Sequence, residues 1–188
     1  ACPTGWHLPS DDEWAELENF FNSGGITDWV TFSGSGEPTL NSGIGPMIRR
    51  VKEITDTPVC VITNGTLLDN PVVRHDIIDA DAVMPSLDSA IEETFRKVCR
   101  PHPDLSVQRI IEGLAAFRKE FKGDIWLEIM LAEGINDSDD EIEALRQAVV
   151  RIQPDAVQLN TVVRPPAESF ARPVSPARLA EIRDAFGN

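Results

Sequence analysis

The sequence contains little cysteine and matches no metal-binding cysteine motif. Its three cysteines, Cys2, Cys60 and Cys99, are odd in number and far apart. This argues against a disulfide framework and against a CxxC metal site. We therefore expect Cys60 and Cys99 to be ordinary core or surface thiols, since a free cysteine behaves as a small hydrophobic residue.

Basic side chains are also scarce. The 188 residues carry 17 Lys and Arg against 31 Asp and Glu, a formal net charge of −14. Binding to a nucleic-acid backbone needs clustered Lys and Arg, so the composition favours a small or neutral ligand over a nucleic acid. A local basic patch formed by Arg49, Arg50 and Lys52 is the one feature of the sequence that would favour binding of a nucleic acid such as tRNA.

Long apolar runs are absent. No run approaches the roughly 20 residues of a membrane span, and no basic start followed by an apolar stretch indicates secretion. We expect a cytoplasmic protein with no membrane partner. With 41% hydrophobic residues the chain can bury one substantial core, so one domain is expected.

Helical and strand-like segments alternate along the sequence, which is typical of βα units that build a parallel sheet. The predicted fold class is α/β, a parallel (β/α) partial barrel. Strands are expected at 29–33, 59–63, 82–87, 125–131 and 157–160, and helices at 10–21, 44–54, 72–78, 92–99, 106–121, 138–152 and 176–186. A barrel of this kind opens with a strand, so a first strand is expected to be missing. Strand 29–33 would then be an exposed edge, through which a homodimer could form.

Polar residues cluster at the carboxyl ends of these strands, where parallel α/β folds bind ligands. Burying an unpaired polar group in a covered strand costs about 1 to 3 kcal/mol, so such residues need partners or a cavity. The five strands therefore predict one shared pocket. Its candidates are Ser33, Ser35 and Glu37, then Thr63 and Asn64, then Ser86 and Asp88, then Glu128, and finally Gln158, Asn160 and Arg164.

Each candidate also has a purely structural explanation. Asn64-Gly65 is a common turn, Ser86 to Asp88 could cap the next helix, and Glu37 could be a solvated loop carboxylate. The acidic run 137–141 fits a helix amino terminus, with Ser138 and Glu141 as a capping box. Gly34 to Gly36 could cradle a phosphate, but the Lys and Ser/Thr of a P-loop are absent. The scattered histidines indicate no metal site.

Four loops of the sequence stand out when read together: Gly34–Leu40 (GSGEPTL), Thr63–Gly65 (TNG), Pro85–Asp88 (PSLD) and Gly134–Asp137 (GIND). Their order and spacing resemble those of the radical S-adenosylmethionine (SAM) superfamily. The resemblance runs from about Thr27 to Arg172. Within the superfamily, the sequence is similar to a subgroup of uncharacterised iron–sulfur oxidoreductases. That subgroup resembles the wybutosine-synthesising enzymes, which modify a tRNA base. The segment 158–168, QLNTVVRPPAE, resembles that subgroup specifically.

The resemblance implies a partial barrel that holds a [4Fe–4S] cluster and SAM. Gly36, Glu37 and Pro38 would lie against the methionyl amino group. The further cofactor-binding residues implied at the other loops and strands are Ser35, Thr63, Asn64, Ser86, Asp88, Glu128, Gln158 and Asn160, with Gln158 and Asn160 approaching the adenine or the substrate.

The sequence departs from that family because it has no CxxxCxxC cluster loop. We expect the isolated chain to bind no cluster and to have no radical activity. Residues 1–14 resemble the opening of an unrelated bacterial surface-protein domain, so we divide the chain into an atypical segment, 1–26, and a core, 27–188. The alternatives are a cluster-less scaffold that binds a small molecule or a protein, and an α/β nucleotide-binding domain.

Overall fold

The computed structural model describes residues 11–23, 27–34, 36–166 and 168–187. Five strands form one sheet in the order β1-β2-β3-β4-β5, and every neighbouring pair is parallel. The strands are β1 Val30–Phe32, β2 Val59–Thr63, β3 Ala82–Pro85, β4 Asp124–Leu131 and β5 Ala156–Thr161. The helices are α1 Asp11–Asn22, η1 Pro38–Leu40, α2 Ile44–Ile54, α3 Pro71–Asp76, α4 Glu92–Cys99, α5 Val107–Glu120, α6 Asp139–Ile152 and α7 Pro176–Phe186. The α/β partial-barrel class expected from the sequence is confirmed.

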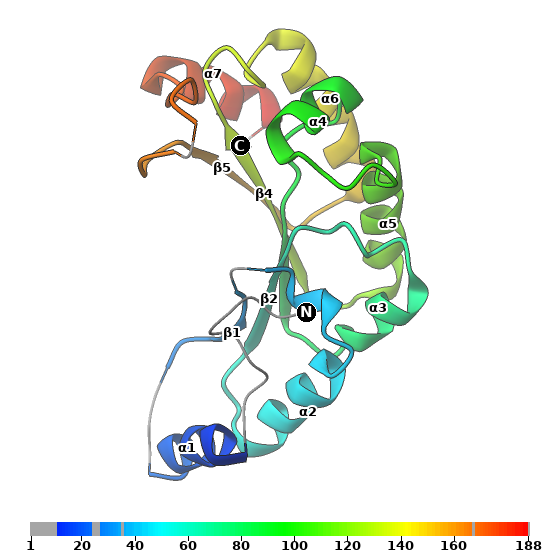
Figure 1. Ribbon diagram of the computed structural model, residues 1–188, viewed down its shortest axis with the longest axis vertical. Coiled ribbons are helices and arrows are strands. Elements are labelled where there is room, and N and C mark those ends of the chain that lie inside the picture. Colours follow the sequence, from blue (N-terminus) through cyan, green and yellow to red (C-terminus); the bar gives the residue numbers. More distant parts are fainter. Residues whose placement is uncertain (1–10, 24–26, 35, 167, 188) are drawn as a thin grey trace.

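The sheet has two different faces. Figure 1 shows α2, α3, α5 and α6 along one side of the sheet, the helix-covered face. Alternation along β4 places Leu127 and Ile129, both fully buried, on that face, whereas Glu128 and Met130 point to the opposite, open face. Because paired residues of parallel strands share a face, the register assigns the rest.

The helix-covered face carries the hydrophobic core. The buried side of α5 consists mainly of Ile110, Ile111, Leu114 and Phe117, at helical spacing. Gly113 lies on the same helix where it touches the loop after β2. A Cβ there would stand 2.5 Å from the backbone nitrogen of Asp69, so only glycine fits.

Carboxylates bind the amino ends of the strands in a repeated way. Asp81, just before β3, accepts the Val59 N–H of β2 at 2.8 Å, and Asp155, just before β5, accepts the Ile125 N–H of β4 at 2.8 Å. Each carboxylate also pairs with a cation. Asp81 pairs with Lys52 at 2.5 Å, and Asp155 pairs with Arg118 at 2.5 Å. Each such residue thus satisfies a backbone donor that the sheet ladder leaves open.

Two tryptophans lie at the same end of the open face. Trp29 precedes β1 and Trp126 lies in β4, and their rings meet edge to face with centroids 5.2 Å apart. The strands between them carry the small side chains of Cys60 and Ala82 on this face. Small residues in the middle of the sheet therefore let the two large rings meet.

The boundaries differ from the sequence expectation in a few places. β3 ends at Pro85, two residues early, because Ser86 makes only an isolated bridge with Glu128. The capping box of α6 is half formed. Ser138 accepts the Glu141 N–H at 3.3 Å, but the Glu141 carboxylate turns to the buried Ser89 hydroxyl at 2.8 Å. The expectation that the Glu141 side chain completes a capping box is therefore wrong.

Replacing Asp81 tests the amino-end carboxylates. Burial opposes ionisation of Asp81, but the Lys52 hydrogen bond and the Val59 N–H together lower its pKa below 3.8. Its stabilising effect is therefore present above pH 3.8 and is lost as the pH falls through the lowered value. We expect Asp81→Asn to reduce the free energy of unfolding by about 1 kcal/mol at neutral pH, with the deficit closing in acid.

Urea unfolding of both proteins between neutral pH and pH 3 measures this deficit. Asp79→Asn is the matched control, because among the described residues the Asp79 carboxylate pairs with the exposed Arg49 alone. A deficit that stays constant across the pH range would contradict the explanation.

Candidate functional site

The Glu37 carboxylate ties the loop after β1 to the end of β2. Its Oε1 accepts hydrogen bonds from the Thr39 N–H at 3.0 Å, the Thr39 hydroxyl at 2.6 Å and the Thr63 hydroxyl at 2.6 Å. Its Oε2 accepts the Asn64 N–H at 2.7 Å. Glu37 is therefore not a solvated loop carboxylate, because four donors occupy it. Its side chain positions the loop, and its backbone carbonyl accepts the Leu40 N–H at 3.2 Å within the helical turn.

The residues around Glu37 form a short helical turn. Glu37 is the amino-terminal cap of η1, which begins at Pro38, and Thr39 is buried. Gly36 is exposed just before this turn. Ser35, predicted as a cofactor-binding residue, lies outside the described residues.

Asn64 and Gly65 form the expected turn. Asn64 Oδ1 accepts the Thr66 N–H at 3.0 Å and the Thr66 hydroxyl at 2.7 Å, and Gly65 has a φ of +72° that favours glycine. The Thr63 hydroxyl, besides its bond to Glu37, accepts the Gly65 N–H at 3.1 Å. The turn explanation therefore holds for the Asn64 oxygen, while its amide nitrogen makes no hydrogen bond to any described residue.

A second polar group spans the ends of β3, β4 and β5 on the open face. Glu128 accepts the Asn160 amide at 2.6 Å and the Ser86 hydroxyl at 3.4 Å. Gln158 pairs with Glu128 in the sheet register and is exposed. Three neighbouring strands therefore contribute to one hydrogen-bonded row. Ser86 does not cap the next helix, since the cap of α4 is Ile91, with no side-chain hydrogen bond.

Asp88 extends this row. Its carboxylate accepts the Met130 N–H at 2.9 Å and the Cys99 thiol at 3.7 Å. Burial raises the Asp88 pKa, the Met130 N–H opposes this, and the negative charge of Glu128 raises it further. Cys99 reaches solvent as a residue, yet desolvation of its thiol and the Asp88 charge raise its pKa to about 12.

Asn136 was not among the predicted site residues, although it lies in the loop 134–137 that the resemblance singled out. It is fully buried. Its amide nitrogen donates to the backbone oxygens of Asp88 at 2.7 Å and Met130 at 2.8 Å, and its oxygen accepts the Ala132 N–H at 2.7 Å. Asn136 thus fixes the ends of β3 and β4 side by side. In the sequence, the one signal for this bridging role is that Asn136 lies in a loop that follows a strand.

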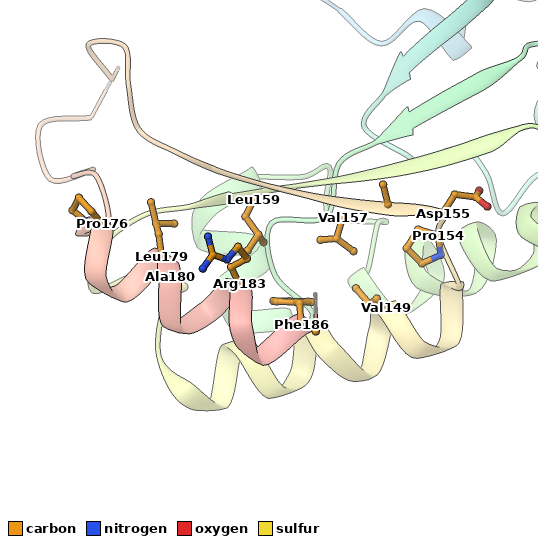
Figure 2. A pocket seen from close by; sticks show the side chains of 12 residues that line it. Val149, Pro154, Asp155, Val157, Leu159, Pro176, Leu179, Ala180, Arg183 and Phe186 are labelled. Atoms are coloured by element: carbon orange, nitrogen blue, oxygen red, sulfur yellow. The ribbon is translucent and has the colours of Figure 1, made fainter.

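The predicted residues form two hydrogen-bonded groups, Glu37 with Thr63 and Asn64, and Glu128 with Ser86 and Asn160. Asp88 lies beside the second group and is bonded to the Met130 N–H of β4. A separate hollow of about 720 Å³ lies between β5, α6 and α7 on the helix-covered face. Figure 2 shows Val157 and Leu159 pointing into it, and these residues alternate with Gln158 and Asn160. The hollow is therefore on the other side of β5 from the candidate site.

The basic patch considered from the sequence is neutralised. Lys52 pairs with Asp81, Arg49 with Asp79 at 3.3 Å, and Arg50 with Glu18 and Glu53. These cations therefore present little free positive charge. No helix in the described part of the chain is long and apolar enough to cross a membrane.

Removing the Glu37 carboxylate tests its positioning role. We expect Glu37→Ala to speed hydrogen exchange of the Asn64 amide about tenfold or more, because a charge-assisted hydrogen bond is lost. Exchange measured by NMR at residue resolution provides the rate. Glu133→Gln, an exposed carboxylate on another loop, is the control. An unchanged Asn64 rate in Glu37→Ala would contradict the role.

The Cys99 thiol is expected to react slowly. In a Cys2→Ser, Cys60→Ser background, Asp88→Asn removes a negative charge and a hydrogen bond that raise the Cys99 pKa. Alkylation at mildly alkaline pH should then accelerate about tenfold or more, since only the thiolate reacts. Glu93→Gln, on the same helix, is the matched control. Equal rates in Asp88→Asn and its parent would refute the coupling.

Comparison with known proteins adds to this geometry. The family model described as the Radical SAM superfamily matches residues 2–146. A protein from Brachyspira hyodysenteriae named "GTPase Obg" is 40% identical over 159 residues, 85% of this chain and 23% of that protein. UPF0026 protein MJ1312 from Methanocaldococcus jannaschii is 34% identical over 146 residues, 78% of this chain and 45% of that protein. The chain thus spans less than half the length of either relative.

The fold has a similar counterpart among solved structures. A radical SAM methyltransferase from Sphaerobacter thermophilus superposes with a TM-score of 0.65 at 20% identity, covering 94% of this chain and 54% of that one. This likeness concerns the fold alone. The family model matches most of the length of this chain, and the chain therefore belongs to the radical SAM superfamily.

Proposed function

We propose that this chain is the SAM-holding part of a radical SAM enzyme core, with the ligand on the open face at the carboxyl ends of the strands. The observation that carries the proposal is the row formed by Ser86, Glu128 and Asn160 on three neighbouring strands. In the family, SAM supplies a 5′-deoxyadenosyl radical that removes a hydrogen atom from the substrate. The role proposed for this chain is to bind and orient SAM through its own side chains.

The residues described fit SAM by their chemistry. Asn160, Gln158 and Asn64 offer amide groups suited to ribose hydroxyls and an adenine edge. Glu128 and Asp88 offer carboxyl groups suited to a cation, and neither pairs with a basic side chain of the described residues. In the Glu37-positioned loop, the carbonyls of Glu37 and Pro38 already accept the Leu40 and Asn41 N–H groups. The backbone carbonyl of the exposed Gly36 is therefore the acceptor that this loop offers to an ammonium group.

The residues described do not fit an iron–sulfur cluster. Cys60 is buried in β2, and the Cys99 thiol is bound to Asp88. No three His, Cys, Asp or Glu side chains are grouped to hold a metal ion in the described ranges. With no CxxxCxxC loop in the sequence, we propose that this chain alone has no radical activity.

The finer sequence-based interpretations remain part of this proposal. They are the similarity to enzymes that modify a tRNA base, the division at residue 26, and a homodimer through the β1 edge. The likeness of residues 1–14 to a surface-protein domain stays a prediction, since residues 1–10 lie outside the described residues. The expected cytoplasmic location also stays a prediction.

SAM titration of the anaerobically reconstituted chain, with iron and sulfide determined on the same sample, tests the proposal. We expect binding of SAM that weakens about tenfold in Asn160→Ala and in Glu128→Gln, because each removes part of the row. We expect no stoichiometric iron.

Gln147→Ala, an exposed amide on α6, is the control and should bind SAM as the unmodified chain does. Unchanged SAM affinity in both row variants would refute the assigned site. About four irons per chain would refute the proposed lack of a cluster. Tighter binding of a simple nucleotide than of SAM would favour the nucleotide-binding alternative.

A further inference from the structure

Two arginines differ from all others in the chain. Every other arginine makes an ion pair with a carboxylate, for example Arg74 with Glu120 at 2.9 Å and Arg118 with Asp155 at 2.5 Å. Arg164 and Arg172 make neither an ion pair nor a side-chain hydrogen bond with any described residue, and both are exposed. In a chain with a net charge of −14, two uncompensated guanidinium groups are unusual.

Both arginines belong to one loop, described at residues 162–166 and 168–173, which we call the β5–α7 loop. It is the orange segment beyond the end of β5 in Figure 1. Its base is closed by Thr161, whose hydroxyl accepts the Val174 N–H at 2.8 Å and donates to the Leu131 oxygen at 2.9 Å. The loop therefore leaves and returns at the carboxyl ends of β5 and β4.

The backbone of the loop is anchored while its arginine side chains are not. The Arg172 oxygen accepts the Glu133 N–H at 3.0 Å, and Pro173 forms a bridge with Ala132 at the end of β4. Glu168, near the middle of the loop, pairs with Arg100 at 2.6 Å. These contacts fix where Arg172 leaves the backbone, and they do not use its guanidinium group.

The loop lies at the same edge of the sheet as the proposed SAM site. Arg164 follows Asn160 by four residues, a span of at most about 14 Å for extended chain. The charged groups of the row, Asp88 and Glu128, are acidic and suit a cation. An anionic group would therefore be repelled by the row and attracted by the β5–α7 loop.

We propose that Arg164 and Arg172 bind an anionic group, a phosphate or a carboxylate, of the substrate beside the SAM site. A guanidinium group matches both anions through two parallel hydrogen bonds, which a lysine cannot supply. The substrate is then a small molecule with an acidic group at one end and its reacting carbon nearer the row. This inference rests on the proposed function for the position of SAM.

Titration of the whole chain with inorganic phosphate, and separately with acetate, tests the inference. The side-chain N–H signals of arginine in ¹⁵N-labelled protein are the readout. We expect saturable shifts with at least one anion, and the anion that binds more tightly identifies the group. Arg164→Gln and Arg172→Gln should each weaken this binding about tenfold, through loss of a charge-assisted hydrogen-bond pair.

Arg146→Gln is the control, because it removes the same charge from an exposed, ion-paired site on α6. Absence of saturation with both anions, or an equal loss in Arg146→Gln, overturns the inference. A matching loss of SAM affinity in Arg164→Gln or Arg172→Gln also overturns it, since these arginines would then hold the SAM carboxylate. Arginine-dependent anion binding in a chain that binds no SAM would instead refute the proposed function and leave the anion site standing.

Discussion

Side-chain hydrogen bonds between neighbouring strand ends are the constraint on which the rest of the structure depends. Parallel strands have no hairpins, so each strand end meets its neighbour only through the ladder and through the loops. Glu37 joins the ends of β1 and β2, and Asn136 joins those of β3 and β4. Without such bonds the loops at the carboxyl edge would have no fixed relation to one another, and no ligand site could persist there.

The two ends of the sheet use carboxylates for different purposes. At the amino ends Asp81 and Asp155 accept backbone N–H groups and also pair with Lys52 and Arg118, so their charges are compensated. At the carboxyl ends Glu37, Asp88 and Glu128 accept hydrogen bonds only from neutral donors in the described residues. The negative charge left there is available to a cationic ligand, which is the physical basis for placing SAM at this edge.

Sequence periodicity predicted most of the elements, because it reflects local geometry. The expected bounds of α2 and β2 match the structure, and Ser106, Ser138 and Ser175 each cap a helix. The partners of polar side chains could not be predicted in this way. Glu141 binds Ser89, 52 residues away in the sequence, rather than completing its own cap. In the same way, polar residues expected to share one pocket satisfy each other in two groups, a choice that depends on sheet register and curvature.

The electrostatics of Cys60 and Cys99 argue against a cluster bound by these two thiols, as the spacing of the cysteines does. A thiol becomes a metal ligand only as a thiolate, which requires a lowered pKa or a positive environment. Burial raises the Cys60 pKa, and burial together with Asp88 raises that of Cys99 to about 12. Asp88 cannot both hold the Cys99 thiol and let it ionise, because each negative charge opposes the other. The pairing that organises the end of α4 therefore keeps Cys99 protonated, and any thiolates for a cluster must come from residues other than these two.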